Sequence, residues 1–367
     1  MPEDLHAECL AWVLRKKGHV VDIWVGSDFP HQQIIHFEFS ADQAYQKLVD
    51  QFGQFAMADY DRVWFRRTAR LHPSQTLHPS DQKMAVEQAT ELREAMFHQI
   101  APDAFWVNPI VSTRQVENKP RQLVIARQAG FQLPRTMVSN DPAAIRRLYR
   151  ECDERMIYKP LRPMSWTGDG RDYDVYTSAL EWEDLKDNEA LQLCPGIYQQ
   201  NLEKVFEVRV NMMGRSVLAV AIDSQSDAQT RQDWRLQSEI GVPLPLRPIE
   251  VPETILRSCR SVMKSFGTVF GAFDFIVTPN GQWVFLEVNG MGQFLWVEEK
   301  RRGANIPMAQ VFSEFLESGD ENFCWSGKVD GDLSLDAYLN SDAYKEYSSD
   351  PLRHHVERPR PSKERVA

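Results

Sequence analysis

The chain has few of the features that mark a secreted, membrane or zinc-binding protein. Its five cysteines are scattered, with no Cys-x-x-Cys pair and no zinc-ligand spacing, which is typical of a reducing compartment. No apolar run approaches the roughly 18 residues that a membrane span requires. The opening residues, Met-Pro-Glu-Asp, lack the basic start and the apolar stretch of a signal peptide. We therefore expect a cytoplasmic protein that does not enter a membrane.

Positive charge is also scarce. The 42 lysines and arginines stand against 52 aspartates and glutamates, a formal charge of −10. This balance argues against nucleic acids and anionic membranes as partners, because both attract basic surfaces. The histidines show no metal-ligand spacing, and Ser224 has no convincing histidine partner for nucleophilic catalysis. The chain therefore offers no candidate nucleophile.

What the chain does have is length and alternating patterns. Its 367 residues allow two or three lobes, each with its own core. An α/β lobe is expected over residues 1–108, with helices at Glu8–Gly18 and Asp81–Gln99 and strands at Val20–Val25 and Asp61–Arg67. The strand that should precede the first helix is absent. Either the annotated start is internal, or another element covers that edge of the sheet.

Two further lobes and an extension are expected. A small α+β lobe covers 109–195, with helices starting after Asn118 and Asn140 and a strand at Met156–Pro160. A larger, strand-rich lobe covers 196–318, with strands near 197–202, 206–212, 217–223, 272–278 and 283–289 and a helix at 252–267. Residues 319–367 form an extension whose charged, proline-punctuated end, from Ser348, is expected to fray or stay disordered.

Two carboxylates are expected to face each other across a hairpin. Asn280-Gly281 between apolar runs indicates a two-residue type I′ turn, and that turn would set Asp274 opposite Glu287. The same register predicts one apolar face, made of Phe273, Phe275, Val277, Val284, Leu286 and Val288. Because facing like charges destabilise a sheet, we expect a cation there. With Asn289 on the same face, these oxygens suit Mg²⁺; a protonated or solvent-facing acid pair is the alternative.

Two basic residues could serve this polar face. In Phe206–Asn211, Arg209 alternates with apolar residues, which places a cation where phosphate charge could be met. An ordinary half-exposed strand with a cross-strand ion pair explains the same pattern. Lys159 lies in an apolar strand, where a buried ammonium needs a partner, unless the strand is an edge from which the side chain reaches solvent.

Taken in order along the chain, these residues carry a resemblance. The series that does so is Lys119, Lys159, Gln199-Gln200-Asn201-Leu202, Glu207-x-Arg209, Asp274 and Glu287-x-Asn289. It resembles the nucleotide site of the ATP-grasp superfamily. The resemblance implies an α/β protein of α+β lobes, in which a small central lobe and a larger C-terminal lobe hold the nucleotide, preceded by an α/β N-terminal lobe. It also implies an ATP-dependent carboxylate–amine or carboxylate–alcohol ligase that uses ATP and two Mg²⁺ ions.

The resemblance implies a role for each matching residue. Lys119 and Lys159 would reach the phosphates, and Arg209 would meet the γ-phosphate. The segment after Gln199 would hold adenine through Gln200, Asn201 and Leu202, and Glu203 or Lys204 would meet the ribose. Asp274, Glu287 and Asn289 would bind the metal. The polar stretch with Gly168 and Gly170, whose spacing is not that of a P-loop, would cover the phosphates.

Shorter motifs over about residues 5–318 narrow the resemblance. They are Ser27-Asp28-Phe29-Pro30, Trp64-Phe65-Arg66-Arg67, Trp106-Val107-Asn108-Pro109, Asp223-Ser224-Gln225 and Asp233-Trp234-Arg235. They are similar to those of the microviridin-type graspetide ligases, which close rings in ribosomal peptides. The implied partner is a precursor peptide with a leader and a core rich in Thr/Ser and Glu/Asp. A Glu or Asp side chain would be phosphorylated, then attacked by a Thr/Ser hydroxyl or a Lys amine, giving an ω-ester or ω-amide.

Several alternatives stay open. Arg235 would grip the acyl phosphate or the substrate carboxylate, or it is a surface arginine beside a structural tryptophan. A ligase of the same fold that joins a free amino acid or small amine to a carboxylate is the second functional hypothesis. A non-catalytic ATP-binding scaffold is the third, although retention of Arg209 and all three metal-ligand residues argues against it. A symmetric homodimer is the general expectation for a soluble enzyme.

Overall fold

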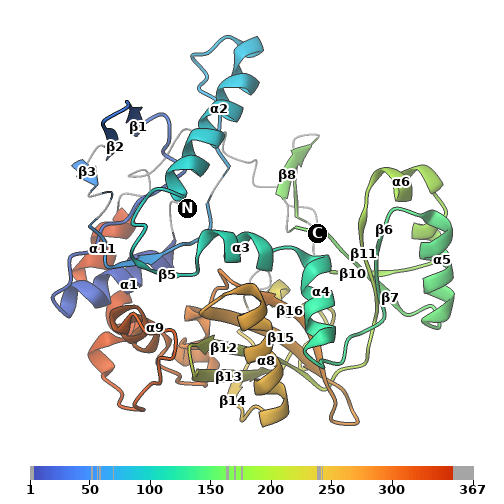
Figure 1. The fold of residues 1–367 in the computed structure, drawn as a ribbon. Helices are drawn as coiled ribbons and strands as arrows, with labels where there is room; N and C mark the ends of the chain where they lie inside the picture. The colour runs from blue at the N-terminus through green and yellow to red at the C-terminus, as the bar shows by residue number, and fades with distance from the viewer. Residues whose placement is uncertain are drawn as a thin grey trace.

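The computed structural model describes residues 4–349, apart from 51, 52, 56, 58, 69, 163, 164, 169, 170, 175, 176, 238–240 and 242, and gives only the backbone of 165–168 and 171–174. Figure 1 shows three groups of elements: an N-terminal group at the left, a small lobe at the right and a larger lobe below. No described helix is both long enough and apolar enough to cross a membrane. The domain boundaries at 108, 195 and 318 remain predictions.

The N-terminal group combines helices with two small sheets. Helix α1 (Leu5–Lys16) begins at Asp4, whose carboxylate accepts hydrogen bonds from the N–H groups of His6 and Ala7. The other elements are β1 (Ile34–Phe39), β2 (Ala44–Asp50) and β3 (Gly53–Phe55) in one antiparallel sheet, the parallel pair β4 (Arg62–Trp64) and β5 (Phe105–Val107), and helix α2 (Pro79–Phe97). The strand predicted at Val20–Val25 is wrong. These residues form no ladder and Val20 is 95% exposed, so this apolar run has no neighbouring strand to pair with.

The small lobe is a four-stranded antiparallel sheet covered by two helices. The strand order is β10 (Ser178–Leu180), β7 (Met156–Lys159), β11 (Gly196–Gln200), β6 (Thr136–Ser139). Helices α5 (Pro142–Glu151) and α6 (Asn188–Leu193) pack on it, through Ile145, Leu148 and Leu191 among others. Strand β7 lies between β10 and β11, so the edge-strand explanation for Lys159 is wrong.

Short elements connect this lobe to its neighbours. Helices α3 (Ile110–Val116) and α4 (Lys119–Gln128) precede it, and α4 is capped by Asn118, whose side chain accepts from the N–H of Arg121. The hairpin β8 (Ser165–Gly168) with β9 (Arg171–Asp174) and the 3-10 turn at Glu183–Leu185 complete it. Gly168 ends β8, and Gly170 of the predicted cover lies outside the described residues.

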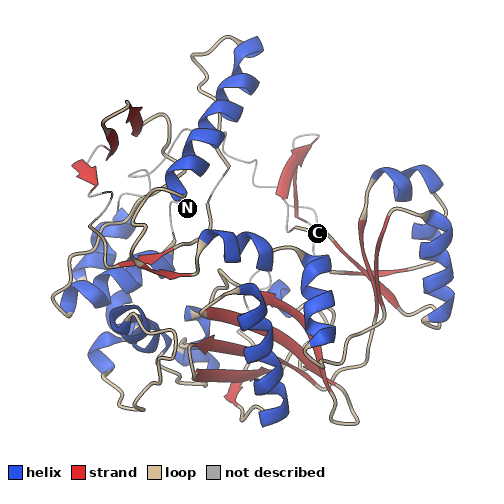
Figure 2. Cartoon of the chain, in the orientation of Figure 1, coloured by secondary structure: helices blue, strands red, loops and turns tan. Residues whose placement is uncertain are grey.

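The large lobe is a five-stranded antiparallel sheet. Its order is β14 (Leu246–Pro248), β13 (Ser216–Ile222), β12 (Phe206–Met213), β15 (Phe270–Val277), β16 (Trp283–Asn289). Figure 2 shows α8 (Glu253–Phe266) lying across one face. The helix buries Cys259, Val262, Met263 and Phe266, the spacing of one helix face, and ends at Gly267 with φ of +67°. The opposite face carries the polar residues of β12, β15 and β16.

The β15–β16 hairpin confirms that Asp274 faces Glu287, but the predicted two-residue turn is wrong. Thr278 and Gln282 pair through the backbone, which leaves a three-residue loop with Gly281 at φ +79°. The three-residue loop alone would pair Asp274 with Leu286. A bulge between Asp274 and Phe275 shifts the register by one residue, so that Asp274 pairs with Glu287. The predicted apolar face is correspondingly wrong at Val284, which pairs with Ile276 on the other face, and at Leu286, which is the extra residue of the bulge. Phe285, fully buried, enters the core in its place.

The C-terminal helices α9 (Met308–Ser318) and α10 (Leu335–Leu339) pack against the N-terminal helix α1. Helix α11 (Asp342–Ser349) follows them. Tyr338 of α10 is 2% exposed, and its ring centre lies 5.6 Å from that of Trp12. The described residues of the C-terminal half of the chain also form four 3-10 turns, at Trp234–Leu236, Leu295–Val297, Lys300–Arg302 and Gly331–Leu333. Of the end expected to fray from Ser348, Ser348 and Ser349 belong to α11, and residues 350–367 lie outside the described residues.

Candidate active site

A row of four charged side chains crosses the polar face of the large sheet. Arg209 on β12 pairs with Asp274 on β15, which pairs with Glu287 on β16. The Arg209 Nε donates to Asp274 Oδ1 at 2.7 Å, and Lys119 forms an ion pair with Glu287. Two side-chain cations therefore lie beside the two acids in this structure. The alternative of a bare, solvent-facing acid pair is wrong, and the cross-strand ion pair of Arg209 is confirmed.

Helix α4 brings Lys119 to this row. The side chain of Gln122 donates to Val288 O at 2.7 Å and accepts from Val288 N at 3.1 Å. Strand β16 is the edge of its sheet, so Gln122 satisfies backbone groups that would otherwise have no ladder partner. The N-terminus of α4, where Lys119 stands, is thus fixed beside Glu287. The positive end of a helix favours anions at this point.

Asn289 completes a three-residue oxygen set. Its Nδ2 lies 3.1 Å from Asp274 Oδ2 and 3.2 Å from Glu287 Oε1, so all three side chains converge on one point. No group of three or more His, Cys, Asp or Glu side chains arranged to hold a metal occurs in the described part of the chain. Two carboxylates and one amide nevertheless fit Mg²⁺, which keeps its remaining positions for water and substrate phosphates. The amide oxygen of Asn289 would face the metal after a flip of the side chain.

The surroundings separate the two acids electrostatically. Burial raises the pKa of Asp274 to about 6, although Arg209 opposes that rise. Burial would also raise the pKa of Glu287, but the neighbouring Lys119 ammonium outweighs it and holds that pKa well below its usual range. Glu287 therefore stays ionised at neutral pH. Asp274 has a pKa closer to neutrality, so its charge is more sensitive to the positions of Arg209 and Glu287.

Lys159 is half-buried and has a partner for its ammonium, as the sequence required. Its Nζ donates to Gln199 Oε1 at 2.8 Å, and Gln199 in turn donates to Thr136 Oγ1 at 2.8 Å. Burial lowers the pKa of the Lys159 ammonium, while Glu287 raises it. The structure thus places Lys159 within the electrostatic reach of the charged row, and Gln199 orients its ammonium.

The expected adenine and ribose segment follows β11 directly. The N–H groups of Gln200 and Asn201 donate to Arg135 O and Arg155 O, both at 2.8 Å. Leu202 is half-buried and Glu203 is exposed. Lys204 donates to Glu207 Oε1 at 2.6 Å. Of the two ribose candidates, Lys204 is therefore engaged by a buried carboxylate.

Two further functional candidates lie in this segment: Glu207, which the sequence placed beside Arg209 without a role, and Gln232, which the sequence did not identify. Glu207 is 7% exposed and lies on the same strand face as Arg209, two residues closer to the adenine segment. Gln232 accepts from Asn201 Nδ2 at 3.2 Å through its side chain and from Lys204 Nζ at 3.3 Å through its carbonyl. The period-two alternation of β12 placed Glu207 on the face of Arg209 but gave it no role. No local pattern marks Gln232.

Arg235 stands on the segment that follows Gln232. Its Nε donates to Asp233 Oδ1 at 2.8 Å, and Asp233 Oδ2 also accepts from Thr177 N at 3.3 Å. The Arg235 side chain is 47% exposed. Burial lowers the pKa of Arg235, but the carboxylate of Asp233 more than offsets this effect. Glu287 and Asp274 add to the rise, so the pKa lies above its usual value. Arg235 is thus neither part of the charged row nor remote from it.

The N-terminal motifs serve packing between lobes. Asn108 is fully buried, donates to Phe270 O and Gly290 O, and accepts from Phe270 N. Arg66 pairs with Asp4, at 2.7 Å from Nε to Oδ2. His6 accepts from the N–H groups of Phe294 and Leu295 through Nε2, at 2.9 and 3.1 Å. Burial lowers the pKa of His6 to about 3, so the ring stays neutral and anchors the loop after β16.

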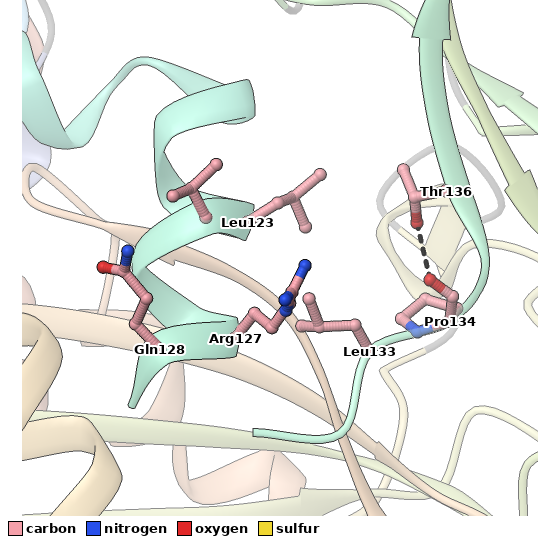
Figure 3. Close-up of a pocket in the computed structure, with 7 residues that line it drawn as sticks. Leu123, Arg127, Gln128, Leu133, Pro134 and Thr136 are labelled. Carbon is pink, nitrogen blue, oxygen red and sulfur yellow. Dashed lines mark hydrogen bonds between the residues drawn. The ribbon is translucent and has the colours of Figure 1, made fainter. Parts of the chain in front are cut away.

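One hollow lies apart from these residues. It is bounded by α4 and the segment leading to β6, and Figure 3 shows its lining residues Leu123, Val124, Arg127, Gln128, Leu133, Pro134 and Thr136. None of the candidate site residues lines it. Its one link to the site is Thr136, which accepts from Gln199.

No protein-family model matches the chain, and no curated protein matches it. The structure of the macrocyclase MdnC bound with precursor peptide MdnA, from Microcystis aeruginosa MRC, is similar at 26% identity and a TM-score of 0.76, over 87% of this chain and 98% of that chain. A RiPP-associated ATP-grasp ligase from Chryseobacterium gregarium, in complex with ADP and a leader and core peptide, is similar at 24% identity and a TM-score of 0.75, over 87% and 94%.

A third similar structure is the ATP-grasp ligase PsnB, complexed with a phosphomimetic variant of its minimal precursor, Mg and ADP. It is 23% identical with a TM-score of 0.66, over 87% of this chain and 96% of that chain. Each relative is thus matched along almost its whole length. The chain has the ATP-grasp fold, which confirms the predicted fold class and the resemblance to this group of ligases.

Proposed function

We propose that the chain is an ATP-dependent ligase that closes rings in a ribosomal precursor peptide. It phosphorylates a Glu or Asp side-chain carboxylate and joins it to a Thr/Ser hydroxyl or Lys amine of the same peptide, as an ω-ester or ω-amide. The observation that carries the proposal is the row Lys119, Glu287, Asp274 and Arg209 with Asn289 at its centre. The likeness to a macrocyclase seen with its precursor peptide supports the substrate class.

The reaction has two steps. A carboxylate oxygen of the peptide attacks the γ-phosphorus of ATP, the bond from that phosphorus to the bridging oxygen breaks, and ADP leaves. The hydroxyl or amine then attacks the acyl carbon, loses its proton, and expels inorganic phosphate with the electron pair of the broken bond. Both steps depend on alignment and charge neutralisation more than on a protein nucleophile, which agrees with a chain that offers none.

The residues of the row would divide this work. Asp274, Glu287 and Asn289 would hold Mg²⁺, which would neutralise phosphate charge. Lys119 and Arg209, which now neutralise the two acids, would turn toward the phosphates, and Lys159 would contact them from the small lobe. Arg235, beside the site and half exposed, would grip the substrate carboxylate or its acyl phosphate. A precursor peptide is the proposed partner, and a homodimer remains a prediction.

The test is a mass measurement. The chain is incubated with ATP, Mg²⁺ and a peptide encoded beside its gene that carries clustered Thr/Ser and Glu/Asp residues. We expect products lighter by one water for each ring, resistant to further condensation once all rings are closed. An unchanged peptide, together with ATP-dependent ligation of free amino acids, would favour the ligase of small amines. ATP binding without any turnover would favour the scaffold.

A further inference from the structure

Trp296 lies against Arg209, the residue of the row that is proposed to contact the γ-phosphate. The Cζ of Arg209 is 5.4 Å from the centre of the Trp296 ring, within the range of a cation–π contact. The Trp296 indole N–H and the Arg209 Nη1 both donate to the carbonyl of Gln293, at 3.1 and 2.9 Å. One backbone oxygen therefore ties the indole and the guanidinium together.

Trp296 is itself held from other sides. Its ring centre is 4.7 Å from that of Trp234, the neighbour of Arg235, and 5.8 Å from the Cζ of Arg302. The loop that carries it is fixed by His6, whose Nε2 accepts from Phe294 N and Leu295 N. These contacts hold the indole in one place whatever Arg209 binds.

Arg209 needs such an anchor because its other partner has a second task. In this structure Arg209 makes two hydrogen bonds to Asp274, at 2.7 and 3.3 Å. In the proposed reaction Asp274 holds Mg²⁺, and a carboxylate that coordinates a cation gives up part of its hold on a neighbouring guanidinium. Among the described residues, the Arg209 side chain, 9% exposed, then keeps the Gln293 carbonyl and the Trp296 ring as its partners.

We infer that Trp296 is a positioning residue that keeps Arg209 aimed at the γ-phosphate when Asp274 turns to the metal. The inference rests on the proposed function, since it assumes that this site binds Mg²⁺ and ATP. It predicts a particular defect in variants of Trp296. Affinity for a nucleotide with a γ-phosphate should fall, whereas affinity for ADP, which lacks the group that Arg209 meets, should not.

The experiment compares two ligands by calorimetry on the purified full chain. The ligands are Mg–ADP and the Mg complex of β,γ-imido-ATP, which is not turned over. The wild-type chain should prefer the imido analogue. Trp296→Ala should reduce that preference by about tenfold, the scale of one charge-assisted hydrogen bond, and leave ADP affinity unchanged within about twofold. Trp296→Phe, which keeps a ring but loses the indole N–H, should fall between.

Trp182→Ala is the matched control. Trp182 also lies against an arginine, with Arg150 Cζ at 5.2 Å from its ring, but it is 37% exposed and packs on Tyr149 of helix α5. This variant should keep the wild-type preference. If Trp296→Ala does not fold, the Phe variant decides the question in the same assay.

Three results would overturn the inference. They are an unchanged preference in the Trp296 variants, an equal weakening of both ligands, which indicates a purely structural role, and a wild-type chain that binds both ligands equally. A wild-type chain that binds neither ligand would overturn the proposed function as well, so the two failures can be told apart.

Discussion

Carboxylates shielded from solvent, half-buried in one region and buried in the other, are stabilised in different ways in two parts of this molecule. In the active site, Asp274 and Glu287 are neutralised by the side chains of Arg209 and Lys119. In the region where α9 and α10 meet, Glu298 is 8% exposed, and it accepts from Ala309 N at 2.8 Å and from Leu335 N at 3.0 Å. Glu298 thus caps the first turns of two helices at once.

The difference concerns what can move. Side-chain cations can turn from a carboxylate to a phosphate, so the acids of the row can be released to a metal. Backbone N–H groups at helix ends cannot leave without unwinding the helix. We therefore expect the acids of the row to matter for turnover and Glu298 to matter for stability, and the following predictions test that division in order of expected effect.

The largest effect is expected for Asp274→Asn and Glu287→Gln. Each removes a carboxylate from the proposed metal set, and turnover in the ring-closing assay should fall by about a thousandfold or more. Circular dichroism should show a folded chain. Glu317→Gln is the control, because Glu317 also pairs with a lysine, Lys17, but lies on the surface of α9. Wild-type turnover in either active-site variant would contradict the claim that the acids of the row are required for turnover.

A smaller effect is expected for Lys119→Met. The variant keeps the length of the side chain but loses the ammonium that pairs with Glu287. Affinity for Mg–ATP should fall by about tenfold to a hundredfold, as expected for losing a charge-assisted contact to phosphate. Calorimetry measures it, with Lys17→Met as the matched variant of another lysine–glutamate pair. Equal affinity in both variants would contradict a phosphate role for Lys119.

The stability half of the comparison is tested by Glu298→Gln. The amide keeps one oxygen, so one of the two capped N–H groups loses its acceptor, and the free energy of unfolding should drop by about 1–3 kcal/mol. Chemical denaturation measures it. Nucleotide affinity should remain that of the wild type. A loss of nucleotide binding without a loss of stability would break the division drawn here.

The smallest effect is a pH dependence of stability. Burial raises the pKa of Glu298 from 4.5 to about 7, although the two N–H donors lower it. Between these values the folded chain binds more protons than the unfolded chain, so the free energy of unfolding should fall as pH rises, by no more than about 1.4 kcal/mol per pH unit. The difference between wild type and Glu298→Gln, followed by denaturation across this range, isolates the effect. A difference that is flat or grows with pH would contradict it.

Local patterns predicted much of the large lobe. Period-two alternation identified β12, β15 and β16 and placed Arg209, Asp274 and Glu287 on one face, because side chains alternate along any strand. The facing of Asp274 and Glu287 was predicted through a turn that does not exist, and the bulge at Leu286 restored the pairing. The result was right although one of its premises was wrong, since two one-residue shifts cancelled.

Other parts of the fold and of the site had no local sequence pattern that predicts them. The sheet of β1, β2 and β3 was not anticipated, and the run at Val20–Val25 was mistaken for a strand because apolar content alone does not provide a pairing partner. The roles of Gln232, Trp296 and His6 depend on contacts with residues far away in the chain. Such contacts leave no periodicity in the sequence.

The sequence by itself determined which residue types stand on each face of β12 and β15, where helices α4 and α5 begin, and where α8 begins and ends, because alternation and capping act over a few residues. Only the tertiary structure decided what meets the two acids. Lys119 reaches Glu287 across 168 positions of the chain, and it does so because α4 bonds the open edge of β16 through Gln122. Docking of this kind depends on the packing of whole elements, which no local pattern encodes.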